Sequence, residues 1–173
     1  DTSSLALQYN HGLPRPVYWV LWLWQRLRGE VLVNDKRVLL TRHLNGYQLL
    51  LRNVVVFNPL LSSEEAFIQR FRQQYHLHLK GMCGKWRIKC HLFDQHNGAL
   101  YPLLEGVGSE SGPDEEMWRW IAHKARPTLS VRDERLYDGW QLSESLESNA
   151  LVLYEFTPLV PREAATEEIH SPR

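Results

Sequence analysis

The chain has 173 residues, which suits a single domain with or without tails and is long enough to bury a hydrophobic core. Aromatic residues make up 11% of the chain and include seven Trp, which argues against disorder over most of its length. The net charge is zero and the pI is about 7.3, below the range typical of a dedicated nucleic-acid-binding domain.

The charges are divided unevenly along the chain. Residues 1–92 carry 13 Lys and Arg against 5 Asp and Glu, whereas residues 93–173 carry 7 against 15. The two parts therefore have net charges of +8 and −8. This asymmetry indicates either a basic surface with an acidic partner or tail, or two halves that neutralise each other.

Several classes of protein are disfavoured. No run reaches the roughly 18 apolar residues that a transmembrane helix needs, and no signal peptide is visible. Cys83 and Cys90 are too few for a disulfide scaffold or a zinc site made of cysteines alone. We expect an intracellular location, cytoplasmic or nuclear. Because the chain begins with Asp1 instead of Met, we also expect it to be a fragment of a longer protein.

Residues 1–13 are polar and lack periodicity, so we predict a flexible lead-in. A helix is predicted over residues 16–28, with proline in its first turn, cations in its last turn and Gly29 as a terminator. The run Val17–Trp24 is apolar nearly all round, which favours a buried core helix. A membrane-contacting helix, a partner-binding helix and a β-strand are the alternatives for this run.

A short strand is predicted at 30–33, followed by a β-hairpin over 37–57. Asn45-Gly46 suits the positive φ angles of a type I′ turn, and such a turn places Leu44 opposite Tyr47 and Leu40 opposite Leu51. Alternation gives one polar, basic hairpin face that also carries Leu39 and Leu50. The other face is apolar and consists of Val38, Leu40, Leu44, Tyr47, Leu49 and Leu51.

The next helix is predicted over 62–75, because Ser62 and Glu65 form a capping box ahead of an apolar stripe that includes Tyr75. We expect it to pack on the apolar hairpin face. Strands are predicted at 76–80, 86–93 and 99–104, the last at a sheet edge because of Pro102.

A third helix is predicted over 113–126, with acidic residues first and basic residues last. The remaining predictions are a short strand at 128–131, a polar loop at 132–139, a helical turn at 143–147 and a strand at 150–156. We therefore expect one α+β domain over 14–157, with a mainly antiparallel sheet of about six strands built on the hairpin, and a disordered acidic tail over 158–173.

Basic residues recur on the polar faces of the predicted strands and on the 62–75 helix. If these strands share one sheet with an open face, that face will attract acidic peptides or phosphates. An ordinary solvated face, or one covered by the acidic segment 109–116, is the alternative. The predicted partner- or polyanion-binding residues are Arg37, His43, Arg52, Arg70, Arg72, His76, His78, Lys80, Arg87, Lys89 and His91.

Signals for catalysis or metal binding are weak. Cys83, Cys90, His91 and His96 do not have standard zinc spacing, so we expect no metal and a buried Cys90. The predicted loop that holds Asp133, Glu134 and Asp138 has the carboxylates for Mg²⁺ or acid–base chemistry, although acidic surface loops usually serve solubility. The sequence has no nucleophile elbow, phosphate-binding loop, dinucleotide-binding glycine motif or H-E-x-x-H motif.

These observations favour a non-catalytic interaction or assembly domain, without a cofactor, that binds a protein partner through aromatic-rich and basic surfaces. A nucleic-acid-binding domain that uses the basic sheet face is the first alternative. A metal-dependent enzyme that uses the 133–138 carboxylates is the second.

Overall fold

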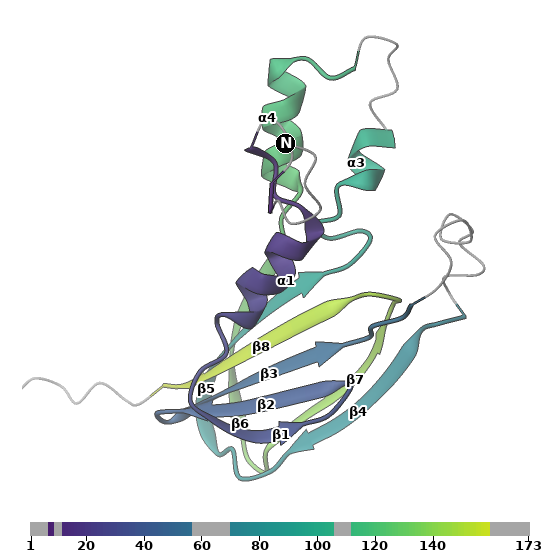
Figure 1. Ribbon diagram of the computed structural model, residues 1–173. Helices are drawn as coiled ribbons and strands as arrows, with labels where there is room; N and C mark the ends of the chain where they lie inside the picture. Colours follow the sequence, from purple (N-terminus) through teal and green to yellow (C-terminus); the bar gives the residue numbers. More distant parts are fainter. Residues whose placement is uncertain (1–6, 9–11, 57–69, 106–111, 160–173) are drawn as a thin grey trace, which may run out of the picture.

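The computed structural model describes residues 7–8, 12–56, 70–105 and 112–159. In this part of the chain two antiparallel sheets pack as a sandwich and the helices lie toward one end, which confirms the predicted α+β class (Figure 1). The larger sheet has six strands in the order β1-β2-β3-β8-β5-β6, and the smaller sheet pairs β4 with β7. The strands are β1 Glu30–Asn34, β2 Val38–His43, β3 Gly46–Arg52, β4 Gln73–Leu79, β5 Gly84–Phe93, β6 Thr128–Leu136, β7 Trp140–Leu146 and β8 Leu151–Pro158.

The main core lies between the two sheets. Alternate residues of the strands point into the space between the two sheets, and most of these residues are apolar. Trp140 of β7 stacks closely on the larger sheet, with ring centroids 4.9 Å from Tyr154 and 4.8 Å from Phe156. The apolar hairpin face is thus covered by β4 and β7. Buried members of this core are Leu49, Leu51, Tyr75, Met82, Trp86, Ile88, Leu136, Trp140, Leu146, Ala150, Val152, Tyr154 and Phe156.

The predicted helix over 62–75 falls largely on residues 57–69, which lie outside the described residues. Its last part is wrong, because Gln73 begins β4 and pairs with Leu146 of β7. Tyr75, assigned to the helix stripe, instead points into the core between the sheets, where its hydroxyl donates a 2.8 Å hydrogen bond to the Arg52 carbonyl. Pairing with β7 and burial of this ring stabilise a strand here.

The β2–β3 turn differs from the prediction by two residues of register. His43 pairs with Gly46, so the loop is Leu44-Asn45, and Leu44 has the positive φ of 54°. A shift of two residues leaves the side chains within both strands on their predicted faces, because side chains alternate with a period of two. Leu44 is the exception, since it was predicted on the apolar face but lies in the loop and is 85% exposed. Gly46 is needed for a close approach instead, since a Cβ there would lie 2.5 Å from the Phe156 carbonyl oxygen.

Three predictions for the second half of the chain are wrong. β6 runs to Leu136 through the predicted 132–139 loop, because it pairs with β5 from Thr128 onward. β7 replaces the predicted helical turn at 143–147, and it turns Trp140 and Leu146 into the core. The predicted edge strand at 99–104 contains a short helix, α3 (Tyr101–Glu105), in which Pro102 occupies the first turn.

Helix α4 (Glu115–Lys124) confirms the predicted third helix. Asp114 is its N-cap and accepts a 2.8 Å hydrogen bond from the Met117 amide. Ile121 and Ala125 of this segment are buried with Leu100 and with Leu13, a residue of the predicted lead-in. The predicted domain limits stay predictions.

Helix α1 (Pro16–Trp24) confirms the first predicted helix, although it ends four residues earlier. It packs on the outer face of the larger sheet, where Trp19 and Leu23 are buried against Leu39, Leu50 and Leu153. The apolar residues on the polar hairpin face therefore form a second core beneath this helix. Among the described residues, no helix is both long and apolar enough to cross a membrane.

Candidate docking surface on helix α1

Helix α1 is apolar on all sides but buries only one of them. Its residues are nearly all apolar or aromatic, and at 100° per residue they divide into three sides. Trp19 and Leu23 face the sheet. On the opposite side Val17, Leu21 and Trp24 are 44%, 49% and 46% exposed. We call these three residues the α1 stripe. A helix with a buried and an exposed apolar side has room for a second packing partner.

The chain just after α1 is held to the sheet by a charged cluster. The Arg26 guanidinium lies 2.9 Å from Glu155 Oε2, and His91 Nε2 lies 3.1 Å from the same oxygen. Burial alone would raise the pKa of Glu155, but hydrogen bonds from His91 and Arg26 outweigh it and lower the pKa to about 2. The Glu155 carboxylate is therefore ionised at neutral pH and fixes Arg26 to β8.

Aromatic packing holds α1 from a second direction. The Trp22 ring meets the buried His91 edge to face at 5.2 Å, and the Arg26 guanidinium lies 4.8 Å from the Trp22 ring centroid. At the other flank, the Arg52 guanidinium lies 5.6 Å from the Trp24 ring. Such cation–π contacts contribute roughly 0.5–1 kcal/mol each at exposed sites. The exposed stripe is thus presented on a helix that is fixed from below and from both flanks.

A groove of about 510 Å³ runs along the Tyr18 and Trp22 side of α1. We call it the α1–β6 groove, because strand β6 begins at its far wall. Its volume lies within the range of small-molecule sites. The lining residues are Pro14, Tyr18, Trp19, Trp22, Arg26, His91, Arg126, Pro127 and Leu129.

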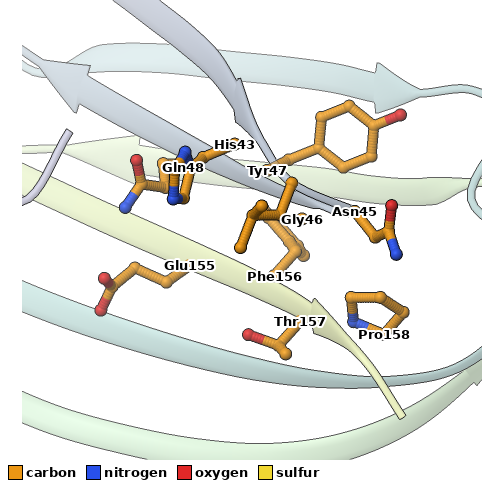
Figure 2. A pocket seen from close by; sticks show the side chains of 10 residues that line it. His43, Asn45, Gly46, Tyr47, Gln48, Glu155, Phe156, Thr157 and Pro158 are labelled. Carbon is orange, nitrogen blue, oxygen red and sulfur yellow. The ribbon is translucent and has the colours of Figure 1, made fainter. Parts of the chain in front are cut away.

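A second hollow, of about 370 Å³, lies between the β2–β3 turn and the end of β8 (Figure 2). Gln48 at its edge is already engaged, since its Oε1 accepts from the Arg28 amide at 2.7 Å and its Nε2 donates to the Arg26 carbonyl at 2.6 Å. Glu155 is held by Arg26 and His91. Figure 2 shows the Tyr47 ring turned away from His43 and Gln48, toward the core. Gln48 and Glu155 thus serve to attach the segment after α1.

The predicted basic residues do not share one sheet. Arg37, His43, Arg52, Arg87, Lys89 and His91 fall on or beside the outer face of the larger sheet, whereas His76, His78 and Lys80 belong to β4 of the smaller sheet or follow it. The outer faces of the two sheets point in opposite directions. A single basic sheet face is therefore not formed, and Arg70 and Arg72 lie just before β4 instead of on a helix.

Several of these predicted residues are also engaged within the chain. Arg87 binds Asp133 bidentately at 2.9 and 3.1 Å, and this hydrogen bonding lowers the pKa of Asp133. Arg72 pairs with Glu147 at 2.8 Å. His91, expected on an exposed face, is buried beneath α1. The predicted basic residues that are exposed lie apart from one another; Arg37 and His43, for example, are at opposite ends of β2.

The carboxylates and cysteines are not gathered into a site. Asp133 and Glu134 are neighbours on β6, so their side chains point to opposite faces of the sheet. Within the described part of the chain, no group of three His, Cys, Asp or Glu side chains is placed to hold a metal ion. Cys83 and Cys90 are both free thiols, and burial raises the pKa of Cys90.

Sequence reasoning missed the residues on which the α1 surface depends. Arg26, Glu155 and Arg126 come from three distant parts of the chain, and the sequence contains no spacing that would join them. One signal was present, namely the all-round apolarity of Val17–Trp24. It indicated burial on most sides, whereas the structure buries one side and leaves another open.

No family model matches the chain. An uncharacterized HTH-type transcriptional regulator of Staphylococcus aureus (strain N315) is 27% identical to it over 154 residues, which are 88% of this chain and 21% of the regulator. The corresponding regulator of strain Mu50 gives the same values. The chain thus spans about a fifth of the length of these relatives.

Solved structures with a similar fold include two glycoside-hydrolase proteins. The GH39 enzyme of Xanthomonas axonopodis pv. citri gives a TM-score of 0.72 at 13% identity, over 89% of this chain and 32% of the enzyme. A monomeric beta-xylosidase of Caulobacter crescentus CB15 gives a TM-score of 0.72 at 14% identity, over 90% of this chain and 33% of the other. At this identity the likeness is one of fold alone.

Proposed function

We propose that this chain is a non-catalytic interaction domain of a larger regulatory protein, and that it docks on a protein partner inside the cell through the α1 stripe. One observation carries the proposal: Val17, Leu21 and Trp24 form a continuous exposed apolar side on a helix that is fixed to the sheet. Apolar patches of this kind are typical of interaction sites.

The energetics favour a partner. Full burial of a large apolar side chain contributes roughly 1.5–3 kcal/mol. Each of the three stripe residues still has almost half of its surface exposed to solvent, so a partner can bury it further. Tryptophan is also enriched among the residues that dominate binding energy. Because α1 is already anchored, docking on it costs little ordering of the helix.

The flanks of the stripe define the chemistry of the partner. Arg28 follows α1 and is exposed, and Arg52 lies against Trp24. These cations favour a partner with an apolar groove edged by carboxylates, because complementary charge speeds encounter and fixes orientation.

The comparisons support a role as one unit within a longer chain. The likeness covers about a fifth of the Staphylococcus aureus regulators and about a third of the GH39 enzymes. The same fold thus accompanies two different kinds of protein. This recurrence supports an accessory role for the domain, since a fold alone does not specify an activity.

Site-specific photo-crosslinking tests the proposal. A benzoylphenylalanine at position 21 is expected to capture a polypeptide in cells that produce the protein. The matched control is position 120 on α4, because Trp120 is also a helical residue with 49% exposure. The captured polypeptide is then purified, and Leu21→Asn is expected to weaken its binding at least tenfold while Trp120→Asn leaves it unchanged. Equal capture from both positions, or normal binding by Leu21→Asn, would refute docking through α1.

Nucleic-acid binding is a second candidate, favoured by the similarity to HTH-type regulators. It relies on exposed cations such as Arg37 and Lys80, whereas Arg72 and Arg87 are ion-paired within the chain. Binding that depends on phosphate contacts weakens as a power of the salt concentration. Titration of labelled DNA and RNA at low and moderate salt tests this candidate, and an absence of salt-sensitive binding eliminates it.

A further inference from the structure

The aromatic rings along the α1–β6 groove pack on one another in a continuous row. Tyr18 and Trp19 meet edge to face at 4.9 Å, Trp19 and Trp22 at 5.8 Å, and Trp22 and His91 at 5.2 Å. Each ring is held by the next, and the last rests on a buried histidine. Rings that are fixed in advance lose little conformational freedom on binding, so the groove is suited to a flat apolar group.

The groove is lined by two arginines, and a carboxylate of the described residues neutralises one of them. Arg26 is neutralised by Glu155 at 2.9 Å. Within the described residues, the Arg126 guanidinium forms no ion pair with a carboxylate, and its one hydrogen bond is donated by Nε to the Ala122 carbonyl at 3.3 Å. A guanidinium presents a planar fork of donors that fits a carboxylate. One anionic group on a ligand would therefore balance the groove.

We propose that the α1–β6 groove binds a small molecule that combines a flat apolar ring with one carboxylate group. The ring lies along Trp22 and Leu129, and the carboxylate pairs with Arg126. This inference does not depend on docking through the α1 stripe, because the stripe and the groove occupy different sides of α1.

A fluorinated probe tests the inference without interference from the seven Trp. 4-Fluorophenylacetate, its neutral amide and the cationic 4-fluorophenethylamine are titrated with the protein, and binding is followed by ¹⁹F NMR. We expect the carboxylate to bind with a Kd on the order of a millimolar, as suits a probe of this size. The amide and the amine are expected to bind at least fivefold more weakly.

Paired variants localise the probe. Leu129 and Val131 project from the same face of β6 with exposures of 55% and 52%, but only Leu129 lines the groove. Leu129→Asn is expected to weaken binding of the carboxylate at least threefold, and Val131→Asn to leave it unchanged. Arg126→Gln is expected to remove the preference for the carboxylate, whereas Arg119→Gln, whose parent side chain is ion-paired with Glu115, should retain it.

Three results would overturn the inference. The first is an absence of binding by all three probes. The second is equal binding of the acid and the amide by the wild-type protein. The third is an equal loss of affinity in Leu129→Asn and Val131→Asn. Because these substitutions change exposed side chains, unchanged thermal unfolding is expected for each and separates a local effect from misfolding.

Discussion

Replacing Glu155 by Gln should remove the charge that holds the segment after α1 to the sheet. The pKa of this carboxyl is lowered from 4.5 to about 2, a difference of about 2.5 units. At about 1.4 kcal/mol per unit, the ionised form stabilises the fold by at most roughly 3–4 kcal/mol. Gln still accepts a hydrogen bond from Arg26, so we expect Glu155→Gln to lower the free energy of unfolding by about 2 kcal/mol at pH 7.

The pH dependence identifies the cause. Because the pKa is lower in the folded state, this stabilisation is complete above about pH 4.5 and is lost as the pH falls toward 2. Urea unfolding followed by circular dichroism at pH 7, 5, 4 and 3 should show a constant difference between wild type and variant at pH 7 and 5, and a shrinking one below. A difference that does not change with pH would refute ion pairing as the source. Glu30→Gln is the control, since Glu30 and Arg42 form an exposed pair that contributes roughly 0–1 kcal/mol.

Two further substitutions test the packing. Asn53→Ala removes an amide that donates to the carbonyls of Phe71, Leu146 and Glu147 at 2.7, 3.2 and 2.8 Å, so urea unfolding should show a loss of about 2–3 kcal/mol; a loss below 0.5 kcal/mol would mean that solvent replaces these bonds. Gly46→Ala places a Cβ 2.5 Å from the Phe156 carbonyl oxygen and should lower stability by about 1–3 kcal/mol, with a reduced Tm in calorimetry; an unchanged Tm would show that β3 and β8 separate easily.

The faces of the larger sheet were predictable because alternation is a local property. Leu49 and Leu51 are buried on the face that was predicted to be apolar. Leu39 and Leu50, on the face that was predicted to be polar and basic, are buried in the second core beneath α1. The turn was less predictable, since Asn45-Gly46 suits a type I′ loop equally well in isolation. Approach of Phe156 to Gly46 sets the observed register, and β8 is more than a hundred residues away.

The second sheet and the α1 surface could not be predicted for a related reason. Gln73–Tyr75 continue a helical pattern locally, and only pairing with β7 stabilises them as a strand. Likewise, Glu134 and Ser143 lie in polar stretches that are typical of loops, yet both belong to strands held by their neighbours. Contacts between distant segments override weak local preference in these cases.

The position of β8 in the larger sheet has a kinetic consequence. Strands β1, β2 and β3 join β5 and β6 only through β8, which is synthesised after all the other described strands of this sheet. Until residues 151–158 are available, β3 and β5 each present an unpaired strand edge, and the two parts of the sheet cannot combine. Pairing of this long range slows folding and prolongs the exposure of such edges. Nascent chains that stop before β8 should therefore be the forms most prone to aggregation and most dependent on chaperones.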